Sequence, residues 1–87
     1  MRPLNYATLK CFDDGASLDA ATVMEQLKDD YGTFRSFRLG AIEESLMAAE
    51  KNDLLERTGF DLDDTGALRV YYRATDYGRD MIARYIR

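Results

Sequence analysis

The side chains with the greatest scope for chemistry are arginines and aspartates, because the 87-residue sequence has no histidine and a single cysteine, Cys11. Without histidine the chain lacks the most frequent general base and the commonest metal ligand. One cysteine is also too few for a structural zinc site. We therefore expect no catalytic residues, no metal and no cofactor, and a binding protein rather than an enzyme.

The acidic segment Asp61–Gly66 is similar to the start of a calcium-binding EF-hand loop. Such a loop needs oxygen ligands at alternating positions and a bidentate glutamate at the twelfth. Here the ninth position is Arg69 and the twelfth is Tyr72. A hairpin turn is therefore the preferred interpretation, with Gly66 suited to positive φ.

Helical periodicity and capping residues predict two helices in the first third of the chain. The first extends from Leu4 to Phe12, with Asn5 as its N-cap and Asp13–Gly15 as its end. The second follows the N-cap Ser17 and is closed by Asp29–Gly32. Its apolar stripe consists of residues at helical spacing, namely Ala20, Val23, Met24 and Leu27.

A third helix is expected after the corner Thr33–Phe37, with either Thr33 or Ser36 as its N-cap. Gly40 either marks a close crossing of two helices or indicates that the helix begins later than Thr33. Asn52–Asp53 supplies the break. The buried face of this helix is predicted to contain Leu39, Ile42, Leu46 and Ala49.

From about Leu54 onward the pattern changes from helical to alternating, which predicts a β-hairpin. Its strands are Leu55–Leu62 and Leu68–Thr75, joined by a turn at Asp63–Gly66. Its inner face is expected to carry Leu55, Phe60, Leu62, Leu68, Val70, Tyr72 and Ala74. A last helix begins at an N-cap, Thr75 or Asp76, and has an apolar stripe made of Tyr77, Met81, Ile82, Tyr85 and Ile86.

This order of elements predicts an α+β fold in a single domain, residues 1–87. Three helices, a two-stranded β-wing and a C-terminal helix are the layout of a winged helix-turn-helix. The predicted core contains Leu9, Phe12, Met24, Leu27, Ile42, Leu46, Leu55, Val70 and Tyr72.

Two segments resemble winged-helix transcriptional regulators of the MarR and PadR type. The segment Ile42–Arg57 resembles the end of their recognition helix and the first wing strand, with Asp53 where many members carry glycine. The segment Val70–Ile82 resembles their return strand and following helix, where a Y-x-x-T-x-x-G-R pattern recurs. That pattern is matched by Tyr72, Thr75, Gly78 and Arg79. The resemblance implies regulation of transcription by a homodimer that binds double-stranded DNA.

The resemblance also implies which residues make the contacts. The residues facing the major groove lie early in helix three and are Arg35, Ser36, Arg38, Glu43 and Glu44. Arginine suits guanine edges or phosphates, whereas glutamate suits a cytosine amino group. Cations on the wing would contact the DNA backbone, namely Arg57, Arg69 and Arg73. Related regulators pair through terminal helices, and the corresponding dimer interface here is Tyr77, Met81, Ile82, Tyr85 and Ile86.

Charge supports an alternative, a winged-helix module that binds a protein partner and no DNA. The net charge is −4, so any attraction for DNA must come from a local basic patch. At the wing tip, Asp61, Asp63 and Asp64 stand where many DNA-binding wings carry Arg or Lys. Fold resemblance by itself does not choose between the two functions.

The sequence also carries expectations about location. The N-terminal residues have no apolar core of a signal peptide, and no apolar run is long enough to span a membrane. A single cysteine fits a reducing compartment. We expect a cytoplasmic protein that does not contact membranes.

Overall fold

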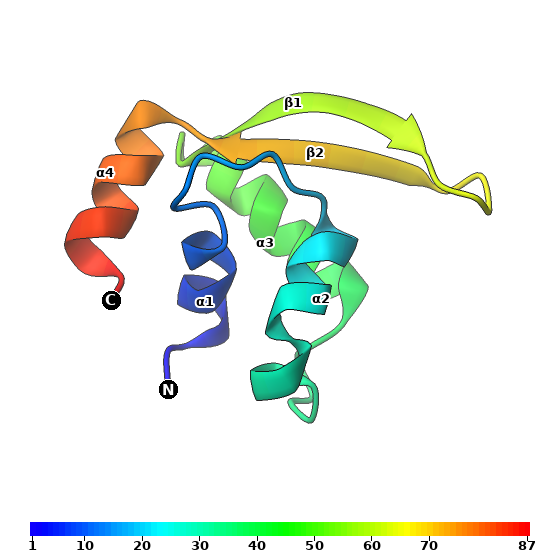
Figure 1. The fold of residues 1–87 in the computed structure, drawn as a ribbon, viewed down its shortest axis with the longest axis horizontal. Helices are drawn as coiled ribbons and strands as arrows, with labels where there is room; N and C mark the ends of the chain where they lie inside the picture. Colours follow the sequence, from blue (N-terminus) through cyan, green and yellow to red (C-terminus); the bar gives the residue numbers. More distant parts are fainter.

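The computed structural model describes all residues from Met1 to Arg87 as four helices and one two-stranded antiparallel sheet. In chain order these are α1 (Leu4–Lys10), α2 (Ala20–Tyr31), α3 (Leu39–Lys51), β1 (Leu55–Leu62), β2 (Leu68–Ala74) and α4 (Asp76–Tyr85). Figure 1 shows α1, α2 and α3 below the hairpin, with α4 beside α1 and the hairpin tip extending past α2. The expected α+β winged helix-turn-helix arrangement is confirmed.

The first helix is shorter than expected and is capped differently. It ends at Lys10, and the chain then turns, with positive φ at Gly15. The N-cap position is Pro3, so the prediction of Asn5 was wrong. The Asn5 side chain instead accepts a hydrogen bond from the Ser45 hydroxyl of α3, at 2.9 Å. Asn5 therefore joins α1 to α3.

The N-cap of α2 is Asp19, and the prediction of Ser17 was wrong. The carboxylate of Asp19 accepts a hydrogen bond from the Thr22 amide at 3.2 Å. Leu18 pairs with Tyr72 of β2 through two backbone hydrogen bonds of 2.8 and 2.9 Å. Because this pairing holds Leu18 in an extended conformation, the helix begins only at Ala20.

The third helix, α3, begins at Leu39, after an extended N-cap residue, Arg38, that makes no side-chain capping bond. Neither Thr33 nor Ser36 caps it, so both predicted caps were wrong. A Cβ at Gly40 would meet nothing within 4 Å. The close helix crossing is therefore excluded, and the later start of the helix is confirmed. After α3 the chain turns through Asp53, which has a φ of 62°.

One hydrophobic cluster lies between the helices and the base of the hairpin. Of the predicted core, the fully buried residues are Phe12, Ile42, Leu46, Leu55 and Tyr72, whereas Leu9, Met24, Leu27 and Val70 are half-buried and pack against them. The cluster also contains Val23, Ala49 and Ala74, together with Leu18, Ala20, Ile82 and Ile86. The base of the wing and the last helix thus share a core with the helix-turn-helix.

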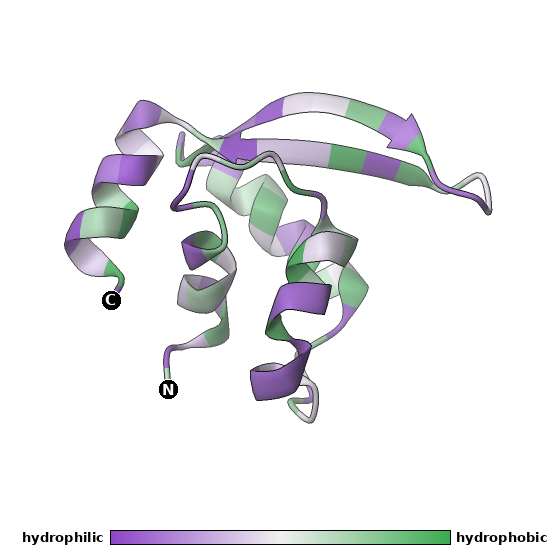
Figure 2. Cartoon of the chain, in the orientation of Figure 1, coloured by the Kyte–Doolittle hydropathy of each residue, from purple (hydrophilic) through white to green (hydrophobic).

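The outer half of the hairpin is exposed, contrary to the predicted inner face. Phe60 lies opposite Val70 and Leu62 lies opposite Leu68, on the face that carries Tyr72 and Ala74 further along β2. Phe60, Leu62 and Leu68 nevertheless remain 75%, 64% and 58% exposed, so their predicted burial was wrong. The helices cover only the base of the hairpin, and Figure 2 shows hydrophobic bands on both strands toward its tip.

The hairpin departs from regular strand geometry at a bulge in β1 and at the turn between its strands. The register shifts between Arg57 and Gly59, which leaves Thr58 as a bulge in β1. The turn at Asp63–Gly66 is confirmed, with a φ of 85° at Gly66. Strand β2 ends at Ala74, one residue earlier than expected, because Thr75 is the N-cap of α4.

The last helix contributes to the core of this chain. Ile82 and Ile86 are 1% and 6% exposed, so their side chains are not available to a second copy and do not fit the predicted interface. Tyr77 and Tyr85 are exposed, and Met81 is half-buried.

None of the four helices has both the length and the apolar character needed to cross a membrane.

Candidate nucleic-acid interface

The predicted base-reading residues Arg35, Ser36 and Arg38 lie in the loop that joins α2 to α3. This loop is held by backbone hydrogen bonds, in which the Phe37 amide donates to the Phe34 carbonyl and the Arg38 amide to the Ser36 carbonyl, both at 3.0 Å. All three predicted residues are exposed and line one surface hollow together with Phe34. They precede α3, so their expected position inside the helix was wrong.

Aromatic packing fixes the loop that carries these arginines. The Phe34 ring meets the ring of Tyr31 edge to face, with centroids 5.1 Å apart, and Tyr31 is itself buried. The Tyr31 hydroxyl donates to the Arg2 carbonyl at 2.5 Å. The loop between the helices is therefore anchored to the first residues of the chain.

Arg35 and Arg38 belong to the half of this protein's lysines and arginines that have no carboxylate partner. Six of the twelve lysine and arginine side chains form salt bridges, and these two do not. They also make no side-chain hydrogen bonds within the chain. An unpaired, exposed guanidinium can contact a phosphate or a guanine edge without first breaking an internal ion pair.

The structure separates the two glutamates that were expected to act together. Glu43 lines the groove between α3 and the hairpin, whereas Glu44 lines the groove between α3 and α1. Neither carboxylate forms a salt bridge. Only Glu43 shares a surface with the wing.

The groove between α3 and the hairpin is mainly apolar and encloses about 440 Å³. On α3 its wall is a stripe of Leu39, Glu43 and Met47, at intervals of one helical turn. Leu39 was expected on the buried face of α3 but is 47% exposed, so that prediction was wrong, and Met47 is 42% exposed. Leu68 and Val70 form the facing wall. Leu39 is thus a surface residue beside the wing.

The three wing arginines are each paired with an acidic side chain. Nε of Arg57 lies 3.0 Å from Glu50 of α3, and the guanidinium of Arg57 lies 5.9 Å from the centroid of the Tyr72 ring. Arg73 donates from Nη2 to Glu56 at 2.8 Å. Arg69 donates from Nε and Nη2 to the two oxygens of Asp61, at 2.7 and 2.9 Å. Contact between these arginines and DNA would compete with these pairs.

The acidic residues of the wing tip are held in ordered hydrogen bonds. The Arg69 side chain lowers the pKa of Asp61, and the hydroxyl of Tyr71 also donates to that carboxylate, at 3.2 Å. The hydroxyl of Thr65 lowers the pKa of Asp63, helped by the amides of Ala67 and Thr65. The structure contains no group of three or more His, Cys, Asp or Glu residues arranged to hold a metal ion.

Sequence reasoning missed the pairing of the wing arginines, although part of it was accessible. Counting outward from the Asp63–Gly66 turn places Asp61 opposite Arg69. The same count would place Arg57 opposite Arg73, and only the bulge at Thr58 brings Glu56 there instead. The pair of Arg57 and Glu50 joins a strand to a helix, and no local pattern indicates it.

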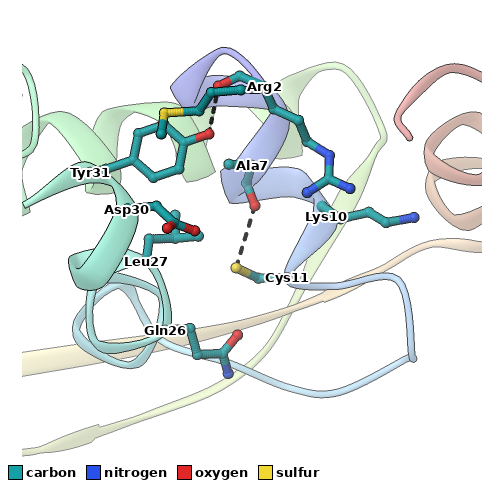
Figure 3. A pocket seen from close by; sticks show the side chains of 9 residues that line it. Arg2, Ala7, Lys10, Cys11, Gln26, Leu27, Asp30 and Tyr31 are labelled. Atoms are coloured by element: carbon teal, nitrogen blue, oxygen red, sulfur yellow. Dashed lines mark hydrogen bonds between the residues drawn. The ribbon is translucent and has the colours of Figure 1, made fainter.

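Another cavity lies between α1 and α2, away from these residues (Figure 3). Its lining includes Lys10, Cys11, Leu27 and Tyr31. The Cys11 thiol donates to the Ala7 carbonyl at 3.4 Å, and burial raises the pKa of this thiol. These features make Cys11 a poor nucleophile, consistent with a packing role.

Solved structures of other proteins share this fold, among them two from Bacillus species. PadR from Bacillus subtilis in complex with operator DNA superposes with a TM-score of 0.75 at 21% sequence identity, covering 98% of this chain and 47% of that one. A PadR-like transcriptional regulator from Bacillus cereus gives a TM-score of 0.67 at 24% identity, covering 92% of this chain and 74% of that one. The first neighbour is bound to operator DNA, and the second is a PadR-like transcriptional regulator.

The likeness is one of structure. The chain spans about half the length of the Bacillus subtilis protein. No family model matches the sequence, and no curated protein matches it.

Proposed function

We propose that this chain binds double-stranded DNA as a transcriptional regulator, through the loop before α3, the α3 surface beside it and the wing. The observation that carries the proposal is the match, over 98% of the chain, to a regulator bound to its operator. In such folds the start of the recognition helix enters the major groove. In this chain Arg38 is the N-cap residue of α3 and Arg35 lies in the loop just before it, and neither guanidinium group has an internal partner.

The proposal also covers the domain organisation, the oligomeric state and the location of the protein. One hydrophobic cluster joins all parts of the fold, which supports a single domain over residues 1–87. A homodimer would use the exposed part of α4, where Tyr77 and Tyr85 are 55% and 68% exposed. A regulator of this kind acts on DNA in the cytoplasm, without cofactor or catalytic step.

A second candidate function is supported by the groove between α3 and the hairpin. Three large, exposed apolar side chains line it, namely Leu39, Met47 and Leu68. Two more, Phe60 and Leu62, are exposed opposite Val70 and Leu68 on the hairpin. Exposed apolar surface of this kind is typical of protein–protein contacts and does not suit a phosphate backbone. A protein partner on this surface would cover the stripe of α3 that faces the wing.

The test of DNA binding is fluorescence anisotropy with a pool of random-sequence duplexes at ~50 mM salt, where weak electrostatic binding is strongest. We expect the chain to bind, and Arg35→Ala and Arg38→Ala each to cost about 1–3 kcal/mol if the arginine reads a base. If two phosphates are neutralised per subunit, the log–log salt slope is roughly −2 for a monomer and roughly −4 for a dimer.

Arg87→Ala is the matched control, because Arg87 is also an exposed arginine without a salt bridge but lies at the far end of α4. It should leave affinity nearly unchanged. If the folded protein retains no duplex at ~50 mM salt, DNA binding is excluded and the protein-binding candidate takes its place. If Arg87→Ala weakens binding as much as Arg38→Ala, the contact surface has been placed wrongly.

A further inference from the structure

The pair of Asp61 and Arg69 has the geometry in which arginine binds a phosphate. Two different nitrogens of Arg69 reach the two oxygens of Asp61, at 2.7 and 2.9 Å. The guanidinium fork binds carboxylates and phosphates in this same two-bond arrangement. The carboxylate of Asp61 therefore fills the place on Arg69 that a DNA phosphate would take.

The hairpin itself prepares this pair. Asp61 of β1 and Arg69 of β2 are direct cross-strand partners in the register, so the backbone already brings them together. The Tyr71 hydroxyl donates to the second oxygen of Asp61 at 3.2 Å and helps to hold the carboxylate in place. The neighbouring pair of Arg73 and Glu56 is joined by a single hydrogen bond. Among the cross-strand pairs of the wing, Arg69 has the partner that most closely imitates a phosphate.

We propose that Asp61 acts as an internal substitute for DNA phosphate, so that Arg69 contacts DNA only by exchanging one oxyanion for another. This inference rests on the proposed DNA binding and concerns how the same surface is regulated. The exchange yields little net affinity, because an ion pair between Arg69 and phosphate resembles the ion pair with Asp61 that it replaces. Both side chains are partly exposed, and exposed ion pairs are weak, so the pair lowers affinity by a limited factor and does not block binding.

A consequence is that wing and loop contribute differently to affinity. Arg35 and Arg38 can reach phosphates without giving up a partner. The hairpin from Leu55 to Ala74 carries four carboxylates and three arginines, so it has no excess positive charge to attract DNA. Removing the carboxylate of Asp61 is then expected to turn Arg69 from a neutralised group into a phosphate ligand.

The experiment compares Asp61→Asn with Asp64→Asn. Both substitutions remove one negative charge from the wing tip, but Asp64 forms no salt bridge with an arginine, so only Asp61→Asn releases Arg69. Anisotropy of a labelled random-sequence duplex is measured at ~150 mM salt, where the Debye length is about 8 Å and the general effect of net charge is damped. Circular dichroism verifies that each variant is folded.

We expect Asp61→Asn to tighten binding by about threefold to fivefold, which is what release of an exposed ion pair can supply. Asp64→Asn should change affinity by less than about twofold at this ionic strength. The salt slope of Asp61→Asn should steepen by about 0.9 per subunit, because one more phosphate is neutralised. In the background Arg69→Gln, the gain from Asp61→Asn should disappear.

Two results would overturn the inference while leaving DNA binding intact. One is equal tightening by Asp61→Asn and Asp64→Asn, which would reveal only a net-charge effect. The other is a gain from Asp61→Asn that persists in the Arg69→Gln background. If neither the parent chain nor any variant binds duplex at ~50 mM salt, the proposed function fails and this inference fails with it.

Discussion

Two helical glycines differ in the space around them, so replacing each with alanine should change the stability of the fold in opposite directions. A Cβ at Gly78 in α4 would lie 1.9 Å from the Leu54 carbonyl oxygen, whereas one at Gly40 in α3 would meet nothing within 4 Å. Gly78→Ala should therefore destabilise the fold by about 1–3 kcal/mol through overpacking. Gly40→Ala should stabilise it by up to about 1 kcal/mol through helix propensity.

Urea denaturation measures both free energies of unfolding, and each variant serves as the control for the other. Equal effects of the two substitutions would contradict the close approach of α4 to the chain at Leu54. A destabilising Gly40→Ala would show that α3 does cross another element closely at that position.

Hydrogen bonds hold the pKa of Asp63 below its usual value, which defines a pH range for the wing tip. The hydroxyl of Thr65 donates at 2.6 Å, and the amides of Thr65 and Ala67 donate at 2.8 and 2.9 Å. Since the pKa is lower in the folded state, the stabilisation is present above the unfolded value and is lost as pH falls through the folded one. It should therefore disappear only below about pH 4.

An NMR titration of the Asp63 carboxyl carbon tests this expectation, with the Thr65 amide as a reporter of the turn. The midpoint should lie below the reference value of about 3.9, and the Thr65 amide signal should shift over the same range. A midpoint at or above the reference value would contradict the hydrogen bonding of the turn.

At the scale of elements, the packing of α3 depends on the side chains of its buried face. Two adjacent residues of α3, one buried and one exposed, test this. Leu46 is 1% exposed, whereas Met47 is 42% exposed and lies on the stripe that faces the wing. Leu46→Ala should cost about 2–5 kcal/mol, because a cavity forms in the core. Met47→Ala should cost far less. A Leu46→Ala protein that melts like the parent would show that the helix is rotated from its described position.

The type and order of the elements were predictable because the patterns that specify them are local. The change from helical to alternating period near Leu54 marks the passage from α3 to β1, and Gly66 fits the positive φ of the turn. Helix starts were not predictable in this way. Ser17 has a good capping side chain, but the pairing of Leu18 with Tyr72 keeps the chain extended past it.

The candidate site was predictable as a set of residue types and less so as a geometry. Period-two alternation identifies the face of the hairpin that carries Phe60 and Leu68, but not how far the helices extend beneath it. The sequence also places Arg69 in the wing, but it does not reveal that the guanidinium group of Arg69 is bound by the carboxylate of Asp61. Both facts depend on the relative length and register of elements, which are tertiary properties.

For the whole molecule, the surface of α4 determines the expected assembly. Tyr77 and Tyr85 are exposed, whereas Ile82 belongs to the core of the chain. We expect sedimentation at ~100 µM to detect a species of twice the chain mass, since this exceeds a micromolar dissociation constant. Tyr85→Glu should shift the species to the monomer, whereas Phe60→Glu, at an exposed aromatic residue of the hairpin, should not.

A monomer in the parent protein at that concentration would exclude a tight dimer. Dissociation by Phe60→Glu instead of Tyr85→Glu would move the interface from α4 to the hairpin.

The bulge in β1 bears on the tendency of the molecule to aggregate. In a two-stranded sheet the outer edge of β1 leaves backbone groups free to pair with a strand from another molecule, and such open edges are aggregation hazards. The exposed Phe60 and Leu62 on this strand increase the hazard. The extra residue at Thr58 distorts the edge, while Glu56 and Asp61 place charge along it. The strand thereby presents an irregular, charged border that disfavours edge-to-edge growth into fibrils.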